Sequence, residues 1–281
     1  MSSACPAHGF AADRRGWHAQ LPPRPRPLAQ PAIWDPITGE EVVLPKLPPD
    51  HICTHRGGRN AAVVCAMGDK CDHLDCHRGP FLVVLVGCSQ AVGMFAYVYS
   101  SEAGEWSEMI STDITRGFLD LNPSVLVGNS LYFVSWASMI LRYNLMTRKI
   151  SEIPLPAKVD PPQIVLTTTE DGGLGFVEVE GSTLCLWSRE VGPDRDTKWI
   201  KYKVIKLETL LPAEALLGKP RVLGFVDGVG VILIWTSDGD FTIDLKSGHV
   251  VKRGEFGGDE SSPMYLCNVV PYMSFHIPGQ N

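Results

Sequence analysis

Short apolar runs separated by polar turns form the dominant pattern along this chain. Between residues 124 and 153 they predict four strands, near Ser124–Val127, Ser130–Trp136, Ser138–Asn144 and Lys149–Ile153. The runs are rich in β-branched and aromatic residues, which sheets favour. Phe81–Val86 is apolar at every position, which is typical of a strand covered on both faces.

The same four-strand pattern returns twice towards the C-terminus. One copy predicts strands near Gln163–Thr168, Gly173–Glu180, Ser182–Arg189 and Trp199–Ile205. The next copy predicts strands near Arg221–Val226, Val229–Thr236, Asp240–Leu245 and His249–Arg253. Residues 237–239, Ser-Asp-Gly, separate two of these runs and are typical of a tight hairpin turn.

Equal spacings indicate a repeat rather than a chance likeness among hairpins. A glycine stands 15 residues before the closing phrase of each copy, in the pairs Gly128/Tyr143, Gly172/Trp187 and Gly228/Ile243. The closing phrase consists of an aromatic or apolar residue, a polar turn and a short strand. It recurs in five places along the chain. The five copies are Trp34–Leu44, Tyr99–Met109, Tyr143–Ile153, Trp187–Val204 and Ile243–Arg253.

Four-strand units at a period near 44 residues predict an all-β, propeller-like array of antiparallel units. Blades of about 40–50 residues leave room for about five to six blades in residues 31–277, in a closed or an incomplete ring. One unit cannot cover both of its faces alone, so stacking neighbouring units provides the core. We therefore expect a single domain over residues 31–277.

Two segments depart from the strand pattern. Residues 1–30 include the polyproline-like stretch Leu21–Pro27, which favours a spacer or a disordered Pro-rich leader over an SH3-type ligand. Leu207–Gly218 has helical composition, with Gly218 as a candidate C-cap, and predicts a short helix between two blades.

Charge and composition narrow the function classes. The chain has 25 Lys and Arg against 31 Asp and Glu, a formal net charge of −6, which argues against nucleic acid as the main partner. No apolar run approaches the roughly 20 residues of a membrane helix, so no membrane partner is expected. The N-terminus lacks a secretory apolar core, and eight cysteines are then expected to be reduced thiols in the cytoplasm, the nucleus or both.

The most distinctive chemical cluster is a short run of cysteines and histidines, the metal-site candidates Cys71, His73, Cys76 and His77. Such side chains can supply part of a tetrahedral zinc site, and His51, Cys53 and His55 could complete it. The spacing matches no standard zinc finger, and a polar loop leading into the Phe81 strand explains the segment as well. We therefore predict no metal and no other cofactor.

Catalytic motifs are not evident. The glycine groups Gly172–Gly175 and Gly228–Gly230 lie between predicted strands, whereas a phosphate-binding loop needs a helix directly after its glycines. Acidic pairs such as Glu170-Asp171 fall at predicted turns, and no nucleophile elbow is present. The sequence therefore predicts no catalytic residues and no enzyme activity.

Two kinds of residue are candidates for partner contacts. Five tryptophans fall in or near the repeat copies, where packing between blades is the first expectation and a protein-binding face the alternative: Trp34, Trp106, Trp187, Trp199 and Trp235. Propellers bind partners through exposed loops, so the longer connections are the other candidates: His51–Asn60, Gly68–Pro80 and Val191–Lys198.

Several phrases spread over residues 31–277 resemble the region after the F-box in plant F-box proteins, particularly those of grasses. They include WDPITGEEVVLP from Trp34, CDHLDCHRGPFLVVLVG from Cys71, PSVLVGNSLYF from Pro123, TTEDGGLGF from Thr168 and PYMSF from Pro271. The resemblance implies a target-recruiting domain of an SCF ubiquitin ligase, whose F-box docks on the Skp adaptor. Nothing between Met1 and Pro31 matches an F-box, so the chain is expected to lack it, and docking on the adaptor is in question.

The sequence therefore favours a protein-binding, substrate-recognition domain whose target and binding face it does not name. Two alternatives stay open. One is a propeller-type enzyme or sugar-binding module, which would need a polar funnel at the propeller axis. The other is a truncated product with no independent activity, in which an incomplete ring exposes a strand edge.

Overall fold

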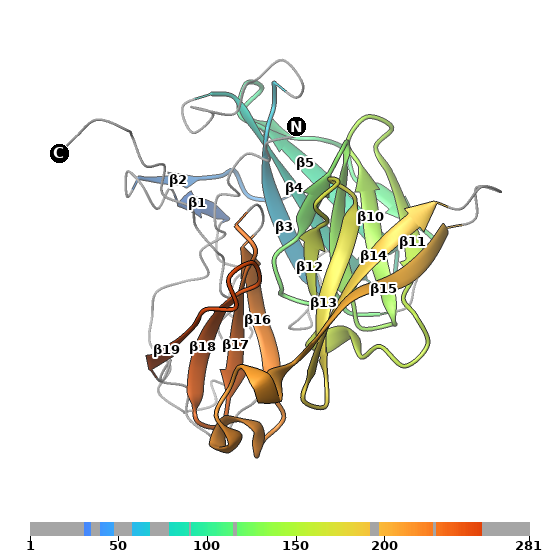
Figure 1. Cartoon of the computed structure of the whole chain (residues 1–281). Helices are drawn as coiled ribbons and strands as arrows, with labels where there is room; N and C mark the ends of the chain where they lie inside the picture. The colour runs from blue at the N-terminus through green and yellow to red at the C-terminus, as the bar shows by residue number, and fades with distance from the viewer. Residues whose placement is uncertain are drawn as a thin grey trace, which may run out of the picture. The chain divides into compact units, whose positions relative to one another are not determined.

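The computed structural model describes residues 31–34, 40–47, 58–67, 79–89, 91–114, 117–191, 197–226 and 229–254 (Figure 1). Over these residues the protein is built from antiparallel β-sheets, with short 3-10 helices and no α-helix. The chain divides into two compact units. Among the described residues, 58–60 and those from 117 to 254 form the larger unit, and the others form the smaller one.

The larger unit contains three four-stranded sheets, each built from consecutive strands (Figure 1). The first sheet consists of β8 (Val125–Val127), β9 (Ser130–Ser135), β10 (Met139–Asn144) and β11 (Lys149–Pro154). The second consists of β12 (Val165–Thr168), β13 (Leu174–Glu180), β14 (Thr183–Val191) and β15 (Thr197–Lys206). The third consists of β16 (Arg221–Val226), β17 (Val231–Thr236), β18 (Gly239–Asp244) and β19 (Val250–Gly254).

These three sheets pack face to face as propeller blades. One core cluster joins the first blade to the second, with Ile140 and Phe176 both fully buried in it. A second cluster joins the second blade to the third through Val177, Leu184 and Ile232, which are also fully buried. Because side chains alternate along a strand, neighbouring residues of β13 enter different cores. The innermost strand β12 contacts β8 and β16, the first strands of the blades on either side.

The smaller unit holds a two-stranded ribbon and a five-stranded sheet, apart from the first two residues of the sheet's first strand, which fall in the larger unit. The sheet consists of β3 (Arg59–Cys65), β4 (Phe81–Ser89), β5 (Gly93–Ser100), β6 (Glu105–Trp106) and β7 (Ile110–Thr112). The ribbon pairs β1 (Ala32–Trp34) with β2 (Glu41–Val43). Ile33 and Leu44 of the ribbon pack with Val83 and Tyr99 of the sheet, which covers one face of that sheet.

One glycine is required by a close approach between strands. Gly175 of β13 lies opposite Ser188 of β14, and a Cβ atom built on it would lie 2.7 Å from the backbone oxygen of Trp187. Real Cβ atoms do not approach backbone oxygens so closely, so any larger residue would push the two strands apart.

The strand predictions from sequence are confirmed in all three copies. Each predicted strand of the larger unit has its counterpart, with ends that agree within two residues. The four-stranded antiparallel blades confirm the all-β, propeller-like fold. The number of blades and the closure of the ring stay predictions, and residues 1–30 and 255–281 lie outside the described part of the chain.

The helix expected over Leu207–Gly218 is replaced by two short 3-10 helices, η5 (Leu207–Thr209) and η6 (Ala213–Leu216). A third, η4 (Pro161–Gln163), lies before β12. Pro212 explains the division, because it has an extended backbone with ψ of 154° and has no N–H to continue a helix. Over the described residues, no helix is both long and apolar enough to span a bilayer.

The core between the second and third blades can be tested with a matched pair of leucines. Leu184 is fully buried in this core, whereas Leu217 after η6 is 85% exposed. We expect Leu184→Ala to lower the free energy of unfolding by about 2–5 kcal/mol because it leaves a cavity. Leu217→Ala should change it by less than about 0.5 kcal/mol. Urea titrations followed by tryptophan fluorescence measure both values, and equal midpoints would contradict this packing.

Candidate functional site

Three large apolar side chains are exposed on two hydrogen-bonded segments beside the first blade of the larger unit. Phe118, Leu121 and Trp136 are 52%, 60% and 47% exposed, which is unusual for such large apolar side chains. Phe118 and Leu121 belong to the connection that leads into β8, and Trp136 begins the turn between β9 and β10. We call these three residues the Trp136 patch.

Hydrogen bonds hold the parts of this patch together. The backbone N–H of Trp136 donates to the carbonyl of Phe118 at 2.8 Å, and Asp120 N–H donates to the carbonyl of Val134 at 2.9 Å. The indole Nε1–H of Trp136 donates to Asp120 Oδ2 at 2.8 Å. Leu119, between the exposed residues, is buried and bridges to Ser135. The connection therefore adds a short strand-like segment beside β9, with its buried side chain facing inwards.

Two asparagines fix the loop beneath the patch. Asn122 N–H donates to Asp120 Oδ1 at 2.8 Å, and the Asn122 side chain donates to the carbonyl of Ile164 at 3.1 Å. The side chain of Asn60, which falls in the same unit, donates to the carbonyls of Asp120 and Asn122, each at 2.8 Å. Both carboxylate oxygens of Asp120 therefore accept a hydrogen bond, one from the loop and one from the turn between β9 and β10. The patch is preformed and presents an indole and two apolar side chains to solvent.

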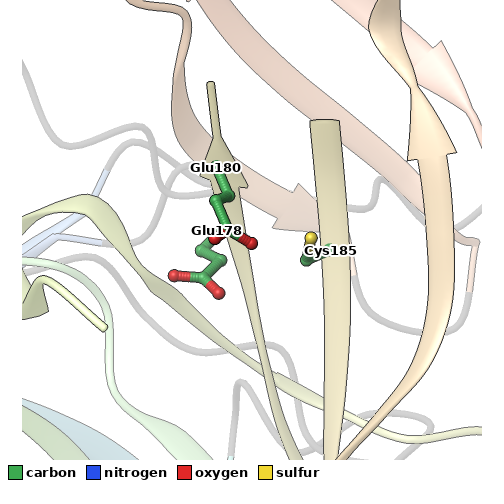
Figure 2. Close-up of side chains that lie close together, drawn as sticks. All are labelled: Glu178, Glu180 and Cys185. Carbon is green, nitrogen blue, oxygen red and sulfur yellow. The ribbon is translucent and has the colours of Figure 1, made fainter. Parts of the chain in front are cut away.

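A second cluster of chemical interest lies on the second blade. Glu178 and Glu180 of β13 and Cys185 of β14 come from neighbouring strands, as Figure 2 shows. Their ligand atoms lie within 4.8 Å of one another, close enough to hold a metal ion. Register explains the grouping, because Glu178 pairs with Cys185 across the two strands and Glu180 lies two residues further on the same face.

A lysine already supplies positive charge to this cluster. Lys201 Nζ of β15 donates to Glu180 Oε2 at 2.9 Å and lies 4.9 Å from the centre of the Trp187 ring. The hydrogen bond from Lys201 holds the pKa of the Glu180 carboxyl below its usual value. A divalent cation would have to displace this ammonium group.

Burial sets the protonation of the other two members. Glu178 is 9% exposed, and desolvation raises the pKa of its carboxyl, although Trp187 Nε1–H donates to Glu178 Oε1 at 2.8 Å and favours the charged form. Burial also raises the pKa of the Cys185 thiol, and Lys201 offsets this only in part. Since metals bind the thiolate, the cluster is better suited to an internal ion pair than to a metal, and we assign it none.

Aromatic packing accounts for the tryptophans around this cluster. Phe176 stacks on Trp187 with ring centres 5.5 Å apart, and it meets Trp199 edge-on at 4.9 Å. Trp199 Nε1–H donates to the carbonyl of Pro154 at 2.8 Å. In the smaller unit, Trp106 packs on Tyr99 and donates to the carbonyl of Pro45. Packing is therefore the role of these three tryptophans; Trp235 is half-buried, and the side chain of Trp34 lies outside the described residues.

The other site predictions fall largely outside the described residues. This is so for the metal candidates Cys71, His73, Cys76 and His77, for the upstream His51, Cys53 and His55, and for most of the loops 51–60, 68–80 and 191–198. The glycines at 172–175 do form a turn followed by a strand, as predicted. Gly172 there has φ of +81°, which glycine adopts without strain.

Sequence reasoning missed the Trp136 patch and the group of Glu178, Glu180 and Cys185, which we call the Glu178 cluster. The sequence places Trp136 at the end of the predicted strand Ser130–Trp136. In the structure the strand ends at Ser135, and Trp136 begins a turn, where its side chain is exposed. Glu178 interrupts an apolar strand, and no local pattern shows that a lysine 23 residues later lies nearby.

Comparison with known families identifies the family of this chain. Residues 32–275 match the family described as F-box protein AT5G49610-like, beta-propeller. The chain belongs to this family. The match confirms the resemblance to F-box proteins over the propeller region, whereas the absence of an F-box stays a prediction. No curated protein matches the chain.

Solved structures give partial overlaps with this member of the family. A structural genomics protein of unknown function from Bacteroides thetaiotaomicron is 16% identical, with a TM-score of 0.43, over 79% of this chain and 52% of that one. The extracellular domain of a one-component system from the same bacterium is 17% identical, with a TM-score of 0.36, over 62% of this chain. This chain spans only 21% of that protein.

The two glutamates of the cluster are expected to have opposite effects on stability. The raised pKa of Glu178 means that folding favours its protonated form, so its stabilising contribution is present below about pH 4.5 and is lost as the pH rises through the pKa of the folded state. Glu178→Gln imitates the protonated form and should raise the denaturation midpoint at pH 7, with a gain that disappears below about pH 4.5.

Glu180→Gln is the control on the same strand. The pKa of Glu180 is lowered, so its contribution is present above the unfolded value near 4.5 and is lost as the pH falls. This substitution should lower the midpoint at pH 7 slightly and have no effect in acid. Urea midpoints measured from pH 3 to pH 8 test both signs, and a gain from Glu180→Gln at pH 7 would contradict the assignment.

Proposed function

We propose that this domain binds a target protein and acts as the substrate-recruiting arm of an F-box-type ubiquitin ligase, with the Trp136 patch as its contact surface. Membership of the F-box-associated propeller family supports the functional class. The choice of contact surface is supported by the exposure of Phe118, Leu121 and Trp136 and by the hydrogen bond that fixes the Trp136 ring. By this proposal the domain works by position, because holding a target near the ubiquitin-transfer machinery raises its effective concentration.

Covering the Trp136 patch with a partner is expected to contribute favourable free energy to binding. Trp is among the residues that contribute most to protein interfaces, especially when a ring of neighbours excludes water. The hydrogen bond from Trp136 to Asp120 fixes the ring before a partner arrives. Less conformational entropy is then lost on binding. The turn and the connecting loop also lie where propellers tolerate variation between relatives.

A sugar-binding module is the rival that fits the patch best, since an aromatic ring beside a carboxylate can hold a sugar. However, each oxygen of Asp120 already accepts a hydrogen bond, Oδ1 from Asn122 N–H and Oδ2 from the Trp136 indole, so only the remaining lone pairs are left for sugar hydroxyls. We therefore favour a protein partner over a sugar. We also propose that the domain has no catalytic activity of its own and that it acts in the cytoplasm or nucleus.

The proposal is tested by differential capture from plant tissue. Tagged wild-type chain, Trp136→Ala and Met146→Ala are compared, because Met146 is a 76%-exposed apolar residue in another turn of the same blade. We expect at least one protein to be retained by wild type and Met146→Ala and to bind Trp136→Ala about tenfold more weakly or worse. Quantitative mass spectrometry measures the ratios, with the Skp adaptor and ubiquitin machinery scored separately.

Identical capture by all three proteins would reject the Trp136 patch as the contact surface. Glycan-array binding that Trp136→Ala abolishes would favour the sugar-binding rival. A wild-type chain that unfolds without a cooperative transition would support the alternative of a product without independent activity.

A further inference from the structure

Strand β15 is an unusually long outer edge. It runs for ten residues, Thr197–Lys206, whereas the corresponding outer strands β11 and β19 have six and five. It is the last strand of its sheet, and among the described strands none pairs with its outer side. An edge strand presents unpaired N–H and C=O groups, which another extended chain can meet.

Large apolar side chains are exposed along this edge. Ile200, Tyr202 and Val204 are 41%, 44% and 57% exposed, at alternating positions of the strand. No other described strand has three such residues. A strand that only closed the blade would gain nothing from presenting them to water.

A bulge places these side chains on both faces of the sheet. Lys203 lies opposite Leu186 and Lys201 opposite Trp187, so Tyr202 has no partner between them. Before the bulge, Lys201 lies over Trp187, on the side of the first blade; after it, Lys203 Nζ reaches the carbonyl of Leu245, on the side of the third. The exposed Ile200 and Val204 therefore flank the edge on opposite faces. A flat apolar partner would meet only one of them, whereas an added strand has side chains on both faces.

The charge of the strand is strongly one-sided. It carries four lysines and no acidic residue in a protein whose net charge is −6. Lys201 is paired with Glu180, and Lys203 donates to a carbonyl. Lys198 and Lys206, near the two ends of the strand, are exposed, and among the described residues no ion pair involves them.

We propose that β15 is a docking edge for an extended acidic peptide of a partner protein, which adds to the second blade as a further strand. Ten residues at about 3.3 Å each span about 33 Å, enough for a peptide of about six to eight residues. Main-chain hydrogen bonds would supply affinity, and the flanking side chains would supply specificity. Carboxylates at the ends of the peptide would meet Lys198 and Lys206, while its apolar residues would cover Ile200 and Val204.

A second copy of this chain is a poorer occupant. Pairing two β15 strands edge to edge would bring eight lysines into one ladder, where like charges oppose pairing. Lysines and a bulge are the usual means by which edge strands avoid such self-association. The same features leave an acidic strand as the complementary partner. This surface is separate from the Trp136 patch, so the inference goes beyond the proposed function and does not rest on it.

The test uses the full chain and a defined probe, a fluorescein-labelled ten-residue peptide with three Glu at each end and four consecutive Val between them, which places both residue types on both faces of the added strand. Fluorescence anisotropy at low and moderate salt measures its dissociation constant. We expect Lys198→Glu/Lys206→Glu to weaken binding about tenfold. Ile200→Thr/Val204→Thr keeps strand propensity and should weaken it about three- to tenfold. Lys149→Glu, at an exposed position of β11, and Met146→Ala are matched controls that should leave binding unchanged.

Several outcomes would overturn the inference. These are no measurable binding of the probe by the wild-type chain, wild-type affinity in both double variants, or undiminished binding of a probe with alternate amides N-methylated. Equal affinity for a single-stranded oligonucleotide of the same charge would show a general polyanion surface instead. Sedimentation that reveals dimers lost in Ile200→Thr/Val204→Thr would identify a second copy as the occupant. Urea midpoints of every variant exclude loss of folding as the cause.

Discussion

Phe176 and Val177 are neighbours on β13, yet one is buried against the first blade and the other against the third sheet of the larger unit. This double burial is the constraint on which the rest of the structure depends. A four-stranded sheet with apolar side chains on both faces is unstable alone, and it needs a neighbour on either side. Within the second blade itself, the tight approach at Gly175 and the stacking of Phe176 on Trp187 join β13 to β14.

The Glu178 cluster is the exception within this apolar packing, and its cost is limited by its partners. A buried carboxylate is unfavourable without hydrogen bonds or a countercharge. Trp187 supplies a hydrogen bond, and Lys201 places its ammonium group between the second glutamate and the indole ring. A cluster that resembles a metal site in its residue types therefore already has protein partners, an indole hydrogen bond at Glu178 and a lysine at Glu180.

Because the blade faces are used for packing, the surfaces free for partners lie at the ends and edges of the blades. The Trp136 patch lies at a turn and a connecting loop, and β15 is an outer strand. The two surfaces differ in chemistry. The first presents an aromatic side chain fixed by Asp120, and the second combines lysines with apolar residues along a bulged edge. With both surfaces, one domain would be able to bind the folded surface of one partner and an extended peptide segment independently.

The sequence by itself determined the strands, since alternation of apolar residues and glycine turns act locally, and it determined the repeat and the family. It failed at Leu207–Gly218, where helical composition was overridden by Pro212. Only the tertiary structure decided that Trp136 is exposed and Trp187 packed, although both are tryptophans within the predicted strands. It also decided that Lys201 of β15 contacts Glu180 of β13. These residues are 21 positions apart in the chain, and β14 lies between their strands. Pairing register and blade packing set these neighbours, and both depend on contacts between residues distant in sequence, which no local pattern encodes.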